Sequence, residues 1–224
     1  GSSSTAVGDR NTASGVQSSA IGHRNTAVAQ NSTAVGTFNT AESGAAFGIS
    51  NTSSGTYANA FGWQNTASGV NANAFGYNNT ASGSGGNAFG NSNTASGSAS
   101  SAVGYRNQAT GTLSSAFGYM NEATGANSVA VGYQNVASAG SGHAVGTSNE
   151  ASGDGSSAFG QNNTASGERS SAFGYENTAS GTRSSAFGYD STAAGHQSLA
   201  IGVGAAATGY EAIAIGRNAT VLAD

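Results

Sequence analysis

The sequence predicts an all-β protein, a flattened parallel β-roll (a solenoid) of about sixteen 14-residue turns. Three observations predict it. The tripeptide Ala-Φ-Gly, with Φ an apolar residue, recurs sixteen times; a second Ala-x-Gly follows each copy at about half the period in most repeats; and the chain holds 36 Gly, no Pro and 7% charged residues. A period kept over a whole chain is typical of architectures in which each unit packs on its neighbours.

The Φ residues mark the turns. They are 14 residues apart, except for the 12 residues between Val35 and Phe47. We therefore expect one repetitive domain over residues 1–224, with one loop shortened at the 12-residue interval. The Φ residues are Val7, Ile21, Val35, Phe47, Phe61, Phe75, Phe89, Val103, Phe117, Val131, Val145, Phe159, Phe173, Phe187, Ile201 and Ile215.

Each repeat reads as two similar heptads, as in 172–174 (Ala-Phe-Gly) and 179–181 (Ala-Ser-Gly). This spacing predicts two short strands per turn. Because strand side chains alternate between faces, Ala and the Gly two residues later are expected to line the interior, with Φ outside. The reverse assignment would bury Asn59, Asn73 and His143, which share the parity of Φ, and burying unpaired polar groups is costly.

Asparagine marks one corner of each repeat. It stands at the fifth position after Ala in thirteen of the sixteen repeats. Because Asn tolerates left-handed backbone and bonds to nearby main chain, we expect it to make the corner itself. A helical alternative fails, since Gly is too frequent and no 3.6-residue period occurs.

Composition argues against several classes of function. The net charge is −4 and the six basic residues are all scattered Arg, which predicts no nucleic-acid partner. Without Lys there is no phosphate-binding P-loop, and without Cys there is no disulfide framework. His23, His143 and His196 are far apart, and acidic residues form no pair. We expect no enzyme activity, cofactor, catalytic residue or metal site.

The Φ residues predict self-association. Stacked turns would align them as one apolar stripe, and soluble monomers rarely expose contiguous apolar patches beyond a few hundred Å². A closed cyclic oligomer would cover the stripe at its axis. Composition does not choose between two-fold and three-fold symmetry.

Three segments carry a resemblance to a known family. Residues 127–135 (Asn-Ser-Val-Ala-Val-Gly-Tyr-Gln-Asn), 198–202 and 212–216 resemble the NSVAIGxxS motif of YadA-like head domains, found in trimeric autotransporter adhesins of Gram-negative bacteria. The 14-residue period extends the resemblance over essentially the whole chain. The chain departs from the motif before Ala, where Val, Leu or Ile occurs only at Val129, Leu199 and Ile213.

The resemblance implies a left-handed β-roll homotrimer whose interface contains the sixteen Φ residues. It also implies display at the bacterial cell surface, with a neck, a stalk and an outer-membrane anchor C-terminal to this chain. Membrane association would come only through that anchor. The implied partners are host matrix proteins of the collagen, fibronectin or laminin class, or the host cell surface.

Two groups of side chains are candidate ligand contacts. Aromatic residues follow the Gly of Ala-Φ-Gly and are expected on the Φ side near the corner; Tyr and Trp are common at binding hot spots, although they could equally shield the edges of the stripe. Two Arg one repeat apart should stack, although surface charge often serves only solubility. The candidates are Trp63, Tyr105, Tyr119, Tyr133, Tyr175, Tyr189, Arg169 and Arg183.

A second function belongs to another class. The outward Thr-x-Ser array, as at Thr66/Ser68 and Thr80/Ser82, could match an ice lattice or serve a purely structural solenoid. The array is interrupted, and the hypothesis leaves the apolar stripe unexplained unless the chain oligomerises. The interruptions are Gln108, Glu122, Val136 and Glu150.

Overall fold

The computed structural model describes residues 1–222, which form an all-β parallel β-solenoid and contain no helix. Two compact units, Gly1–Leu113 and Ser114–Asp224, are each built from eight turns of one long and one short strand. The expected two strands per turn are confirmed. Within the described residues, no helix is long and apolar enough to cross a membrane.

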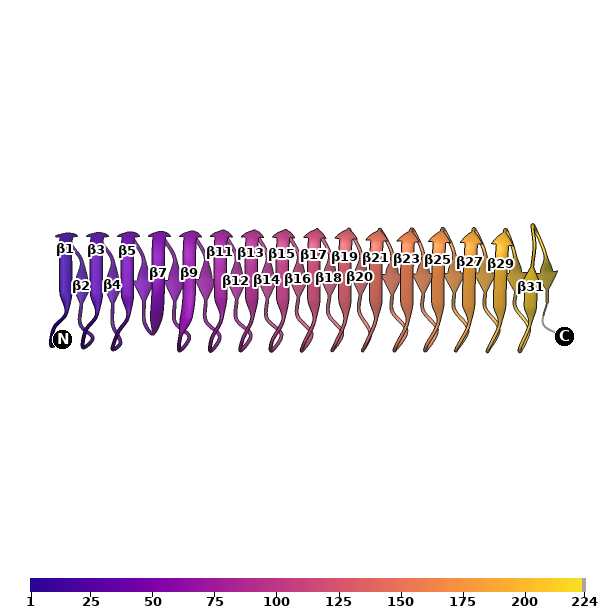
Figure 1. Ribbon diagram of the computed structural model, residues 1–224, viewed down its shortest axis with the longest axis horizontal. Helices are drawn as coiled ribbons and strands as arrows, with labels where there is room; N and C mark the ends of the chain where they lie inside the picture. The colour runs from indigo at the N-terminus through magenta and orange to yellow at the C-terminus, as the bar shows by residue number, and fades with distance from the viewer. Residues whose placement is uncertain (223–224) are drawn as a thin grey trace. The chain divides into compact units, whose positions relative to one another are not determined.

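In the first unit, the long strands lie side by side in chain order and form one parallel sheet, with the short strands forming a second (Figure 1). The long strands are β1 (Thr5–Asp9), β3 (Ser19–His23), β5 (Thr33–Thr37), β7 (Gly44–Ile49), β9 (Ala58–Trp63), β11 (Asn73–Tyr77), β13 (Asn87–Asn91) and β15 (Ser101–Tyr105). The short strands are β2 (Thr12–Ala13), β4 (Thr26–Ala27), β6 (Thr40–Ala41), β8 (Thr52–Ser53), β10 (Thr66–Ala67), β12 (Thr80–Ala81), β14 (Thr94–Ala95) and β16 (Gln108–Ala109).

The second unit repeats this plan. Its long strands are β17 (Ser115–Tyr119), β19 (Val129–Tyr133), β21 (His143–Thr147), β23 (Ser157–Gln161), β25 (Ser171–Tyr175), β27 (Ser185–Tyr189), β29 (Leu199–Val203) and β31 (Ile213–Ile215). Its short strands are β18 (Glu122–Ala123), β20 (Val136–Ala137), β22 (Glu150–Ala151), β24 (Thr164–Ala165), β26 (Thr178–Ala179), β28 (Thr192–Ala193), β30 (Ala206–Ala207) and β32 (Thr220–Val221).

Each turn therefore has two corners. The first corner follows the long strand, and the second corner follows the short strand. Strands pair in register, so that each residue lies beside its counterpart one repeat away, as Phe75 lies beside Phe61 and Phe89. In each unit, the side chains at the same position of successive turns therefore form a row.

The interior is thin and is filled by small side chains. Ala74 on the long strand and Ala81 on the short strand are fully buried, as are the equivalent Ala of the other described turns after the first. The prediction that Ala faces inward is confirmed. The prediction for the Gly after Φ is wrong: Gly76 is exposed, and the interior is completed instead by Asn, by Ser and by the Gly of the second heptad, such as Gly83.

Asparagine at the first corner is buried and hydrogen-bonded in a ladder. Asn79 Nδ2 donates to the carbonyl oxygens of Phe75 (3.0 Å) and Gly90 (2.7 Å) and lies 2.9 Å from Asn65 Oδ1. Its own Oδ1 accepts from the backbone and side-chain nitrogens of Asn93, both at 3.0 Å. Each amide therefore ties its own turn to both neighbours.

The expected left-handed backbone at Asn is wrong by one residue. Asn78, the residue before the ladder position, has φ 54°, whereas Asn79 does not have a positive φ. The turn is made by the exposed residue, which leaves the Asn side chain free to point inward. The corner assignment itself is confirmed.

Candidate functional site

The outward surface of the long strands, here the Φ face, carries the Φ residues of each unit. In the first unit, Phe47, Phe61, Phe75 and Phe89 stack with ring centroids 4.7, 4.8 and 5.1 Å apart. This spacing follows from the strand separation, because in-register strands place identical side chains about 4.8 Å apart. Stacking covers the ring faces, and all four side chains remain partly exposed.

The Φ face of the second unit has the same construction. Phe159, Phe173 and Phe187 stack at 4.9 and 5.2 Å. Phe117 remains 37% exposed and Ile215 64% exposed. All sixteen predicted Φ residues lie on long strands and none is buried, so each unit presents an apolar surface that its own fold does not cover.

A polar row flanks the rings of the first unit. Asn59 Nδ2 donates to Asn73 Oδ1 and Asn73 Nδ2 to Asn87 Oδ1, both at 3.0 Å. These half-buried amides stand one residue before the inward-facing Ala, on the Φ side of β9, β11 and β13. Because they satisfy one another, they can lie beside the Phe rings without unpaired polar groups.

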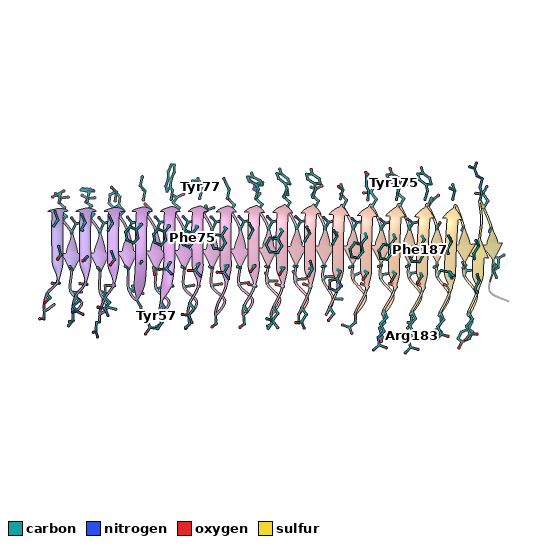
Figure 2. All side chains as sticks on the ribbon, viewed as in Figure 1. Tyr57, Phe75, Tyr77, Tyr175, Arg183 and Phe187 are labelled. Carbon is teal, nitrogen blue, oxygen red and sulfur yellow. The ribbon has the colours of Figure 1, made fainter. Side chains whose placement is uncertain are left out.

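The predicted aromatic contacts lie on the edge at the first corner. Figure 2 shows Tyr77 and Tyr175 extending beyond the strand ends, whereas Phe75 and Phe187 lie over the strands. The expectation that these aromatic residues sit on the Φ side is therefore wrong. The positive φ of the Gly after Φ, 120° at Gly76, breaks the strand alternation and turns the next side chain outward.

Neighbouring aromatic residues of this edge pack on one another. The rings of Trp63 and Tyr77 meet edge to face at 5.3 Å, and those of Tyr175 and Tyr189 stack at 5.2 Å. The hydrogen bond to the Glu176 carboxylate, and its negative charge, raise the pKa of the Tyr175 phenol. The edge thus carries short aromatic rows, and the Glu176 charge acts on the phenol of Tyr175.

Tyr119 and Tyr133 stack at 5.1 Å in the second unit, and Tyr105 of the first unit lies under the Arg106 guanidinium at 5.1 Å. Arg–aromatic contacts of this kind contribute about 0.5–1 kcal/mol at exposed sites. All six predicted aromatic contacts therefore occupy the same position in their turns, as the last residue of a long strand.

The two predicted Arg lie at the second corner. Arg183 projects from the edge opposite Tyr175 (Figure 2). Arg169 occupies the same position one repeat earlier, and its Nε is 3.9 Å from Glu168 Oε1, with both side chains more than half exposed. The structure does not bring the predicted Tyr and Arg contacts together, so they cannot form one compact site.

The second corner also holds features that the sequence reasoning missed. Among the described residues, Tyr57 and Tyr210 are the most exposed large hydrophobic side chains, at 74% and 71%. Beside Tyr57, the shortened turn leaves a notch of about 490 Å³. The 12-residue interval is the sequence signal at this corner, and by itself it predicts only a tighter loop. Among residues 1–222 no group of three His, Asp or Glu side chains could hold a metal ion.

The comparison with protein families agrees with this geometry. The YadA head domain repeat (2 copies) matches residues 1–25, 13–39, 67–86, 109–135, 137–163, 151–177, 165–191, 179–205, 193–219 and 207–224. These matches cover more than half of the chain and reach both units, so the chain belongs to the YadA head family. No relative among the curated proteins matches it.

Proposed function

We propose that this member of the YadA head family is the head of a trimeric surface adhesin, which attaches a bacterium to host matrix proteins or host cells. The single observation that carries the proposal is the family match over both units. The match also supports display at the cell surface. Collagen, fibronectin and laminin are the proposed classes of matrix partner.

The Φ face supports a homotrimer. Its stacked rings remain partly exposed, and several Φ residues are more than a third exposed. An apolar surface of this kind is stabilised when a second copy covers it, at about 25 cal/mol for each Å² removed from water. Three left-handed rolls that turn their Φ faces to a common axis would bury it and leave both corner edges accessible.

The accessible edges favour binding by many weak contacts. Each turn presents only a few exposed residues at each corner, their side chains change from turn to turn, as from Tyr57 to Leu113 to Arg183 at the second corner, and the Tyr and Arg rows lie on opposite edges. A single turn therefore offers few contacts to a binding partner. Three chains with repeated contacts would gain affinity through effective concentration.

The alternative of an ice-binding or structural solenoid is not favoured. Thr66 and Thr80 do stand in register on the outer side of the short strands. However, each short strand is only two residues long, so one hydroxyl per turn lies on the sheet, and Gln108 or Glu122 replaces Thr in other turns. A thermal-hysteresis measurement would still separate the two functions, since an adhesin head should show none.

The oligomer is tested by sedimentation and light scattering. We expect the mass of three chains. Phe173→Asp should dissociate the trimer because it places three like charges at the axis, whereas Thr178→Asp, on the opposite sheet, should leave it intact. A monomeric wild type, or equal tolerance of both substitutions, would contradict the proposed interface.

Adhesion is tested by binding of the trimer to immobilised collagen, fibronectin and laminin and to host cells. Deletion of residues 143–170, two whole repeats, keeps the strand register and should lower binding gradually. Complete loss after one substitution at an exposed position, with the trimer intact, would indicate a discrete site instead. Absence of binding to every matrix and cell type would refute the proposed adhesion.

A further inference from the structure

The 12-residue turn removes two residues from a second corner and changes no strand pairing. Ala34 still pairs with Ala46, and Ala41 with Ser53, across the shortened connection. By position in the repeat, Ser43 replaces Ala29 and Gly44 replaces Ser32. The two residues that would stand between Ser43 and Gly44 correspond to the surface pair that makes the second corner in the other described turns, such as Gln30 and Asn31.

That exposed pair contains one peptide group, and these groups form a hydrogen-bonded row at the second corner. The N–H of Asn31 donates to Val16 O at 3.0 Å, and the N–H of Asn71 donates to Thr56 O at 2.8 Å. Further along the first unit, Gly85 N donates to Val70 O at 2.7 Å. Each peptide group donates to the turn before it and accepts from the turn after it.

The shortened turn breaks this row. Within residues 1–222, the carbonyl oxygen of Gln30 accepts no hydrogen bond and the N–H of Tyr57 finds no acceptor. Both residues line the notch of about 490 Å³. They belong to turns two repeats apart, a separation of roughly 9–10 Å at about 4.8 Å per turn.

One planar amide fills such a gap. In a trans secondary amide the N–H and C=O point in opposite directions, so a single group can donate to Gln30 O and accept from Tyr57 N–H. This is the role that the missing peptide group plays in other turns. A ligand with only hydroxyls lacks this fixed pair of opposed groups.

The walls of the notch favour a neutral ligand with hydroxyls and a flat face. The lining residues carry no charge; they are Ala29, Gln30, Asn31, Ser43, Gly44, Thr56 and Tyr57. Asn31, Ser43 and Thr56 offer hydrogen-bonding side chains at the rim. The Tyr57 ring is 74% exposed and can stack on a sugar.

We propose that the notch binds the acetamido group of a 2-acetamido-2-deoxy sugar. The amide completes the broken row, and the ring hydroxyls meet the polar side chains of the notch. A peptide fits less well, because its chain would have to leave sharply on both sides of one amide. The inference does not depend on the proposed matrix adhesion, because it concerns a sugar-binding site at one turn and the adhesion is spread over many turns.

The test uses saturation-transfer NMR and a titration of the whole chain with methyl 2-acetamido-2-deoxyglucoside. We expect binding, with the strongest transfer to the acetamido methyl, and none with methyl glucoside, which lacks the amide. Equal or tighter binding of N-acetylalanine methylamide would overturn the sugar in favour of a peptide. No binding of either amide would overturn the site.

Two variants locate the binding. Insertion of Thr-Asn between Ser43 and Gly44 restores the 14-residue period and should close the notch, weakening binding about tenfold or more through the loss of both backbone hydrogen bonds. Tyr57→Ala should weaken it by a smaller factor, whereas Asn71→Ala, the equivalent position one repeat later, should not change it. Unaltered binding in both the insertion and Tyr57→Ala would overturn the assignment.

Discussion

In most turns each corner holds a buried polar side chain, Asn at the first corner and Ser at the second, and only the Asn side chain bonds to the neighbouring turns. At the first corner, the Asn79 amide contacts two carbonyl oxygens and two neighbouring Asn side chains. At the second corner, the hydroxyls of Ser18 and Ser32 donate only to a carbonyl oxygen three residues earlier in their own turn, and the buried Ser100 hydroxyl has no partner among the described residues. Asn stands in thirteen turns, with Ser191, Ala205 and Ala219 in the other three, whereas Ser stands in ten turns at its position and is otherwise replaced by Ala or Gly.

The difference indicates that bond number, and not burial, decides which residues can be exchanged. Removing one partner of a buried hydrogen bond costs about 1–3 kcal/mol for each group left unsatisfied. Asn79 satisfies several such groups at once, whereas Ser100 satisfies none through its side chain. The Asn position of the first corner is therefore the more constrained of the two, and the Ser position of the second corner is the more permissive.

The largest expected effect is from glycine replacement at the first corner. Gly76 has φ 120°, and a Cβ there would overlap the carbonyl oxygen of Gly90 in the next turn. We expect Gly76→Ala to cost about 4 kcal/mol or more in the free energy of unfolding, measured by urea denaturation. Its second-corner control, Gly85→Ala, should cost little, because Ala99 holds a similar backbone there at φ 51°. Equal losses in the free energy of unfolding of the two variants would contradict the proposed difference between the corners.

The next effect compares the two buried polar side chains. We expect Asn79→Ala to lower the free energy of unfolding by about 3 kcal/mol or more, because it leaves buried backbone and amide groups unpaired in both adjacent turns. Ser100→Ala should change it by less than about 0.5 kcal/mol. Hydrogen exchange should speed up only around the Asn79 ladder. A costly Ser100→Ala would mean that the hydroxyl has a partner in solution.

The smallest effect concerns the solvent side of the first corner. Because the Glu176 carboxylate raises the pKa of the Tyr175 phenol above its ordinary value of 10.0, Glu176→Gln should lower that pKa. NMR titration of ring-labelled tyrosines can follow the change, with Tyr133 in the same position of another turn as the control. An unchanged titration midpoint of Tyr175 in the Glu176→Gln variant would contradict the coupling between the Glu176 charge and the Tyr175 phenol.

Part of the corner geometry could be predicted from the sequence. The described chain has 28 non-Gly residues with positive φ, and none of them is Thr, Val or Ile, although Thr is frequent elsewhere. Left-handed backbone is strained for β-branched side chains, so their absence marks the turn residues. Applied to the position before Asn, this rule would have placed the left-handed residue correctly.

The sequence by itself determined the period, the in-register stacking and the inward position of Ala, because a strict repeat allows only one alignment of neighbouring turns. The same period carried the resemblance to the YadA head family. It also implied the uncovered apolar Φ residues, since alternation along a strand is a local property of the chain.

Only the tertiary structure decided what each corner does. Burial of Asn, the exposure of the Gly after Φ, and the separation of Tyr175 from Arg183 onto opposite edges appear when turns are stacked. The notch beside Tyr57 has the same origin, since a two-residue loss becomes a gap only between two complete turns. These features arise from contacts between residues 11 to 14 positions apart, and a pattern read along one turn does not contain them.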